Sequence, residues 1–80
     1  MKPLYPDSAR RQGIEGTVVL KLRITERGSV DELQVERSAG HPDLDHAAMD
    51  AVRRWRFEPA RRSGEPVAVW VLVPVEFKLQ

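Results

Sequence analysis

The sequence predicts a two-layer α+β domain, in which two helices cover one face of a three-stranded antiparallel sheet. Two long segments alternate apolar and polar residues, as half-buried strands do. A segment between them repeats apolar residues at helical spacing. The length of 80 residues leaves room for one core only. We therefore expect residues 1–80 to form a single domain in the order α-β-β-α-β.

The chain is expected to begin with a short helix. Pro6 suits the first turn of a helix, residues 7–12 tolerate helix, and Gly13 supplies a stop. From Gly16 the period changes to two, which predicts a half-buried strand. Its inward-facing residues are Val18, Leu20, Leu22 and Ile24.

A turn and a second strand should follow. Residues 26–29 have the composition of a hairpin turn. The strand is predicted to run roughly from Val30 to Ser38, with Leu33 and Val35 facing inward. Val30 is out of phase with that pair, which indicates either a bulge or a place in the turn.

The clearest helix comes next, and Pro59 prevents it from continuing. Its apolar face consists of Leu44, Ala47, Ala48, Ala51, Val52 and Trp55. Residues 60–66 are polar and rich in helix and strand breakers, so they are expected to form a loop. Trp55 and Phe57 are expected in the core.

The last segment predicts one long strand, because apolar residues of one parity run from Val67 to Leu79. Pro74 has no N–H to donate, so this strand should lie at an edge of the sheet with position 74 facing outward. The outward positions are then Ala68, Trp70, Leu72, Pro74 and Glu76. Trp70 and Leu72 would also form an apolar patch with Val19 on the solvent face, although isolated surface apolar residues are common.

Composition argues against several functions. The formal net charge is +1 and the chain has no cysteine, which excludes disulfides and thiolate chemistry. The arginines at 53, 54, 56, 61 and 62 suit a helix C-terminus better than a nucleic-acid surface. His41, Asp43, Asp45 and His46 should point in different directions, and the serines lie in turn-like contexts. We expect no metal, no cofactor, no nucleic acid and no catalysis.

No apolar run reaches the length of a membrane span, and the start Met1-Lys2-Pro3 lacks the apolar core of a signal peptide. If the protein is exported, its targeting segment should therefore lie upstream of these 80 residues.

Several motifs resemble the TonB C-terminal domain family over nearly the whole chain. Pro3-Leu4-Tyr5-Pro6 resembles the P-x-Y-P entry of that family, and Ile14-Glu15-Gly16-Thr17-Val18 resembles the I-x-G-x-V of its first strand. Ser38-Ala39-Gly40, Leu44-Asp45 and Ala47-Ala48 match the run into its main helix. The most specific match is residues 53–59, Arg-Arg-Trp-Arg-Phe-Glu-Pro. Lys2 stands where the best-studied members have glutamine, so this chain cannot make a contact that requires the glutamine side chain.

The resemblance implies the periplasmic domain of an energy transducer. Such proteins join a proton-motive-force-driven inner-membrane complex to outer-membrane transporters for siderophores, cobalamin or similar nutrients. The domain would bind a short transporter segment, the TonB box, by strand addition at Ala68, Trp70, Leu72, Pro74 and Glu76. Tyr5 and Pro6 are further candidates for partner contact, although both would also dock the first helix. The arginine cluster could meet an acidic surface on the transporter or the cell wall.

An alternative of another class remains open. The same fold could serve as a structural or interaction module fused to a sensor or envelope protein, like a TolA-type scaffold, with no transporter client. The exposed strand edges could also pair two copies into a homodimer.

Overall fold

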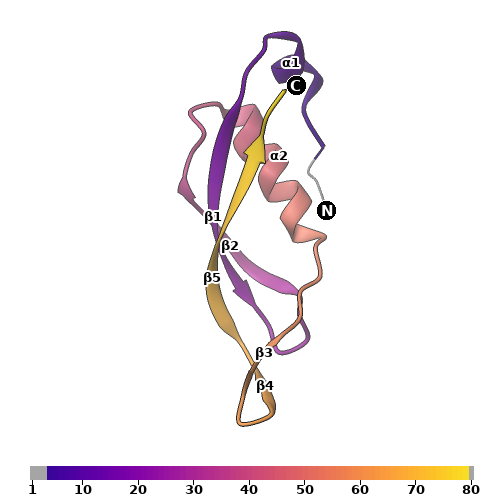
Figure 1. The fold of residues 1–80 in the computed structure, drawn as a ribbon, viewed down its shortest axis with the longest axis vertical. Helices are drawn as coiled ribbons and strands as arrows, with labels where there is room; N and C mark the ends of the chain where they lie inside the picture. The colour runs from indigo at the N-terminus through magenta and orange to yellow at the C-terminus, as the bar shows by residue number, and fades with distance from the viewer. Residues whose placement is uncertain (1–3, 80) are drawn as a thin grey trace.

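The computed structural model describes residues 4–79 and confirms the predicted fold class (Figure 1). Lys2 and Pro3, which belong to the entry motif, lie outside the described residues. The elements are α1 (Asp7–Arg11), β1 (Gly16–Ile24), β2 (Val30–Arg37), α2 (Pro42–Arg53), β3 (Ala60–Arg62), β4 (Glu65–Val67) and β5 (Val69–Phe77). β2, β1 and β5 form an antiparallel sheet in that spatial order, and β3 and β4 form a separate two-stranded hairpin.

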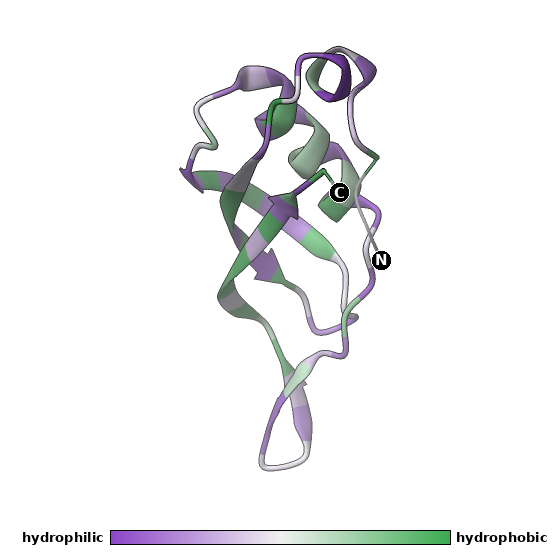
Figure 2. Ribbon diagram, turned by 45° about the horizontal axis from the view of Figure 1, so that its top comes forward, coloured by the Kyte–Doolittle hydropathy of each residue, from purple (hydrophilic) through white to green (hydrophobic). Residues whose placement is uncertain are grey.

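The core lies between the sheet and the helices. Its buried residues are Ala9 of α1, Leu44, Ala48 and Val52 of α2, Val18, Leu20 and Leu22 of β1, and Val75 and Phe77 of β5. All of the β1 residues among them share one parity, as the alternation predicted. α2 covers one face of the sheet, and the other face is left to solvent (Figures 1 and 2). α1 lies at one end of the molecule and contributes Ala9 to the core (Figure 1).

Local sequence explains the helix boundaries. Pro6 is the N-cap of α1, one residue before the predicted first turn, and Gly13 follows the helix with a φ of 68°. Such a positive φ favours glycine and stops a helix. α2 begins at Pro42, carries Asp43 and Asp45 in its first turn and ends at Arg53. Acidic residues at the start and a basic one at the end suit the helix dipole.

The β1–β2 turn is hydrogen-bonded to the segment that follows α2. The backbone N–H of Phe57 donates to the carbonyl of Gly28 at 2.8 Å. Gly28 has a φ of 82°, and a Cβ at that position would lie 2.0 Å from the carbonyl oxygen of Phe57. Only glycine fits this close approach of two backbones.

The bulge suggested by Val30 is present. Ile24 pairs with Val30 while Arg23 pairs with Glu32, so Asp31 is the extra residue. Its carboxylate pairs with the guanidinium of Arg23. A second shift between Val19 and Leu20 leaves Glu36 without a partner on β1.

The predictions about burial hold only in part. Val35 pairs with the buried Leu20 and so faces inward as predicted, but it is 37% exposed, because β2 has no strand on its outer side among the described residues. The second strand ends at Arg37, one residue before its approximate predicted end. Trp55 and Phe57 pack against the core but are only half-buried, because α2 ends at Arg53, before both.

The segment 60–66 is not a plain loop. It folds into the β3–β4 hairpin, which extends from the body of the molecule and is rich in hydrophilic residues (Figures 1 and 2). The turn residues Ser63 and Gly64 both have positive φ values, 51° and 82°. Two-residue hairpin turns with this twist match the twist of the strands. The Ser-Gly pair was therefore the signal that the sequence reading missed.

The hairpin also interrupts the last strand. Val67 pairs with Ala60 in β3, whereas Val69 pairs with Ile24 in β1. Ala68 lies between the two ladders, outside both strands, and is half-buried. The predicted continuous strand from Val67 to Leu79 is therefore two strands, because the chain changes its pairing partner at Ala68.

Candidate functional site

The candidate site is the free edge of β5. β5 has β1 on one side and no strand on the other among residues 4–79. Its pairing with β1 runs from Val69 opposite Ile24 to Phe77 opposite Gly16 without a register shift. A regular strand at a sheet edge offers unpaired N–H and C=O groups to any extended chain.

Two observations show which backbone groups face that edge. The backbone N–H of Leu79, an odd position, donates to the Glu15 carboxylate at 2.6 Å, and Glu15 directly precedes β1. Pro74, an even position, stands opposite Val19 and has no N–H to donate. Odd positions therefore face β1 and even positions face outward. We call the backbone groups of Trp70, Leu72, Pro74 and Glu76 the outward row.

The rest of the described chain leaves the outward row without a partner. Residues 69–77 make no backbone hydrogen bond outside their pairing with β1 within residues 4–79. No described side chain donates to or accepts from these backbone groups either. The outward row can therefore accept a further strand without displacing any described segment.

Apolar side chains flank the outward row on the solvent face. Trp70 is 44% and Leu72 is 59% exposed, and Val19 beside Pro74 is half-buried. The ammonium of Lys21 lies 5.3 Å from the centre of the Trp70 ring, a cation–π contact that holds the ring in place. An added strand would bring its own solvent-facing side chains beside Trp70 and Leu72.

The entry segment, residues 4–6, packs against the end of β5. The Tyr5 hydroxyl donates to the carbonyl of Ile14, and the Tyr5 ring stacks edge-on against Phe77 with centroids 5.4 Å apart. Desolvation and the nearby carboxylate of Glu15 raise the pKa of Tyr5 above its usual 10.0. Tyr5 is half-buried in this position.

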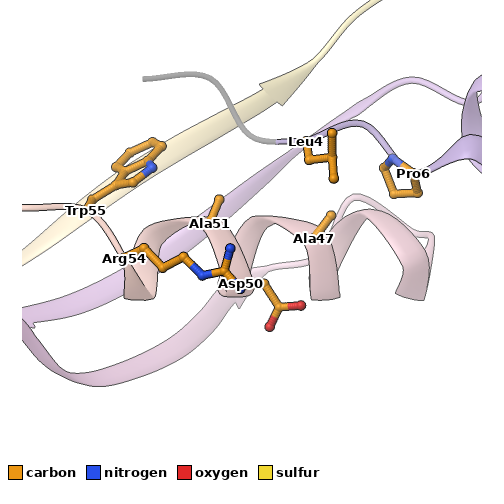
Figure 3. A pocket seen from close by; sticks show the side chains of 7 residues that line it. All are labelled: Leu4, Pro6, Ala47, Asp50, Ala51, Arg54 and Trp55. Carbon is orange, nitrogen blue, oxygen red and sulfur yellow. The ribbon is translucent and has the colours of Figure 1, made fainter.

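A groove on the helix side of the molecule was not foreseen. It has a volume of about 390 Å³ and lies between the entry segment and α2 (Figure 3). Its lining is Leu4, Pro6, Ala47, Asp50, Ala51, Arg54 and Trp55. The Nε1 of Trp55 is buried without a hydrogen-bond partner among the described residues.

The helical pattern contained a signal for this groove. The predicted apolar face of α2 consists of two rows with a spacing of four residues. Leu44, Ala48 and Val52 form the first row and are fully buried. Ala47, Ala51 and Trp55 form the second row and are half-buried along the groove. The sheet buries only the first row, because the apolar face of the helix is wider than the surface that the sheet can cover.

The charged residues do not gather into one site. The Asp43 carboxylate accepts a hydrogen bond from the Ser8 hydroxyl at 2.9 Å, and Asp45 accepts one from the Ala39 N–H at 2.9 Å. No three His, Asp or Glu residues within 4–79 are arranged to hold a metal ion. Arg61 donates to the Gly64 carbonyl within its own hairpin, while Arg53 lies 3.6 Å from Asp50 on α2.

None of the helices in residues 4–79 is long and apolar enough to cross a membrane. The protein is thus a small α+β domain with one regular edge strand, β5, that has no neighbouring strand on its outer side among the described residues.

Comparison with known proteins identifies the family within that class. The family model for the Gram-negative bacterial TonB protein C-terminal region matches residues 1–79. The chain therefore belongs to the TonB C-terminal domain family.

Individual relatives agree with this assignment. Protein tonB2 of Pseudomonas aeruginosa is 48% identical over 77 residues, which is 96% of this chain and 28% of that protein. Protein TonB of Xanthomonas campestris is 43% identical over 77 residues, which is 96% of this chain and 34% of that protein. The solution NMR structure of the Pseudomonas aeruginosa TonB CTD matches with a TM-score of 0.84 at 35% identity, over 100% of this chain and 81% of that chain. The chain thus spans about a third of the length of these curated relatives.

Proposed function

We propose that this chain is the periplasmic C-terminal domain of a TonB-type energy transducer. It binds the TonB box of outer-membrane TonB-dependent transporters by β-strand addition. This binding couples the proton motive force to the uptake of siderophores, cobalamin or similar nutrients. The link to the inner-membrane complex would be made by parts of the protein outside these 80 residues.

One observation carries the proposal: a domain of the TonB family has a regular edge strand whose outward row is unpaired within the described residues. The residues proposed to contact the partner are Trp70, Leu72, Pro74 and Glu76 of β5, with Ala68 before the strand and Tyr5 and Pro6 of the entry segment. Ala68 contributes least to strand pairing in this proposal, because it lies between two ladders.

The energetics predict moderate affinity. Each hydrogen bond added along the edge contributes about 0.5–1.5 kcal/mol net. The outward row can donate from Trp70, Leu72 and Glu76 and accept at all four positions. Several such bonds and the contacts with Trp70 and Leu72 are needed to offset the cost of ordering an extended peptide. Reversible binding suits a partner that must engage and release a transporter.

An NMR titration of the labelled domain with a synthetic TonB-box peptide tests the proposal. Chemical-shift changes should concentrate at Trp70, Leu72 and Glu76. Leu72→Pro should weaken binding about tenfold, because it removes an outward N–H and puts a ring in its place. Leu72→Val keeps the N–H and an apolar side chain, so it is the matched control and should bind almost normally.

Two outcomes would contradict the proposal. Shifts centred on the Asp45 and Arg53 side of α2 would place the peptide on the helix layer instead of the edge. Loss of the fold in Leu72→Pro would show that the N–H of position 72 bonds to β1, so that the odd positions would face outward.

A further inference from the structure

Pro74 lies in the middle of the outward row. The row can donate N–H groups from Trp70, Leu72 and Glu76, but the pyrrolidine ring replaces the donor at position 74. Pro74 is exposed, and no strand lies beyond it among the described residues. A chain that pairs across position 74 must leave one of its own carbonyls unpaired opposite the ring.

This defect affects two kinds of partner unequally. A peptide that pairs along the whole of β5 meets one Pro74. A second copy of the domain that pairs through β5 forms a twofold-symmetric antiparallel contact, in which each residue i opposite j is matched by j opposite i. Any such contact that includes Pro74 therefore includes it twice. With Val73 on the twofold axis, for example, Leu72 of each copy faces Pro74 of the other.

Registers that avoid Pro74 leave little to pair. β5 begins at Val69, so only residues 69–73 remain on that side of the proline. A symmetric contact through this part places Trp70 opposite Leu72 and makes few hydrogen bonds. Within residues 4–79 the other edge strand of the sheet is β2, and its pairing with β1 skips Asp31 and Glu36.

We propose that Pro74 is a specificity residue that lets β5 accept a foreign strand while it prevents two copies of this domain from pairing through the same edge. The part concerning the foreign strand rests on the proposed function. The part concerning self-pairing follows from the edge geometry alone.

The variant Pro74→Val tests this proposal, since valine restores the N–H and favours strands. One recovered hydrogen bond should strengthen binding of a TonB-box peptide about fivefold. Two recovered bonds should strengthen self-association about thirtyfold, roughly the square of that factor. Sedimentation velocity measures the dimer, and amide hydrogen exchange at Leu72 and Glu76 identifies the edge involved.

Pro66→Val is the matched control. Pro66 is also an exposed strand proline, but it pairs with Arg61 in the β3–β4 hairpin. This variant should remain monomeric at the concentrations where Pro74→Val dimerises. Pro74→Ala restores the same N–H without the bulk of valine, so it should shift both equilibria in the same direction.

The outcomes separate this proposal from the proposed function. Dimers of Pro74→Val with protected Leu72 and Glu76 amides support the role of Pro74, even if no peptide binds either form; in that case the proposed function fails alone. Pro74→Val and Pro74→Ala that stay monomeric like the native chain would overturn the role of Pro74. So would a dimer whose protected amides lie on β2.

Discussion

The two free edges of the sheet differ in how well they can accept another strand. β5 pairs with β1 over nine residues without a shift, whereas the pairing of β2 is broken at Asp31 and at Glu36. β2 has the sequence VDELQVER, with four charged residues among eight. β5 has the sequence VWVLVPVEF, with a single charge. Bulges and charges are the usual means by which proteins protect an edge from pairing.

This difference favours β5 over β2 as the edge for the proposed strand addition. The bulges and charges of β2 disfavour regular pairing with a peptide or with a second copy. β5 keeps a regular backbone and is restricted only at Pro74. Protection of one edge and not of the other is consistent with the binding function proposed above.

The strongest effect is expected from a substitution that destabilises the whole fold and not one edge of the sheet. Gly28→Ala places a Cβ 2.0 Å from the Phe57 carbonyl in a backbone with a φ of 82°. It should lower the free energy of unfolding by about 3 kcal/mol or more. This loss of stability would affect both edge strands, because the β1–β2 turn could no longer pack against the segment after α2 and the whole sheet would be destabilised. Urea denaturation followed by circular dichroism measures this loss.

Gly64→Ala is the matched control for that measurement. Gly64 has the same φ of 82°, but nothing lies within 4 Å of the added Cβ. It should cost about 1 kcal/mol through backbone strain alone. Equal losses in the two variants would mean that the contact between Gly28 and Phe57 contributes nothing.

An intermediate effect compares one apolar side chain from each edge strand. Trp70→Ala should weaken TonB-box peptide binding about tenfold, because an added strand at β5 loses an aromatic contact worth about 1–2 kcal/mol. Val35→Ala on β2 removes a side chain that is similarly exposed, 37% against 44%. It should leave the affinity unchanged in isothermal titration calorimetry. Equal weakening by both variants would place the peptide on both edges and would remove the distinction between them.

The weakest effect is expected from the ionisation of Tyr5, whose ring packs against Phe77 at the end of β5. The pKa of Tyr5 is raised above 10.0, so the folded state binds the phenol proton more tightly than the unfolded state. This contribution to stability is fully present at a pH below the pKa that Tyr5 has in the unfolded state. It is lost as the pH rises through the pKa that Tyr5 has in the folded state. The native chain should therefore lose stability above a pH of about 10 relative to Tyr5→Phe.

Absorbance can follow this ionisation directly, because Tyr5 is the chain's single tyrosine. Denaturation curves of the two proteins over the same pH range then give the linked loss of stability. Parallel curves for the native chain and Tyr5→Phe would show that the phenol has the same pKa in both states.

Much of the fold could be predicted from local patterns. The alternation in β1 and the helical spacing in α2 identified the core residues Val18, Leu20, Leu44 and Val52, because one buried face imposes its period on the sequence. The hairpin at residues 60–67 was missed, because its strands are short and exposed and have no such face. Val35 has the inward direction that its parity predicted, but it is exposed, because burial at a sheet edge depends on neighbouring elements.

Some features of the candidate site could likewise be predicted from the sequence, and others could not. The sequence alone determined the family motifs, the parity of β5 and the edge position required by Pro74, because these depend on side-chain chemistry and on a missing N–H. The strand order, the change of pairing partner at Ala68 and the second register shift of β2, at Glu36, could not be predicted and are seen in the folded chain alone. Those features depend on which segments meet, and contacts between segments distant in sequence leave no period in the chain.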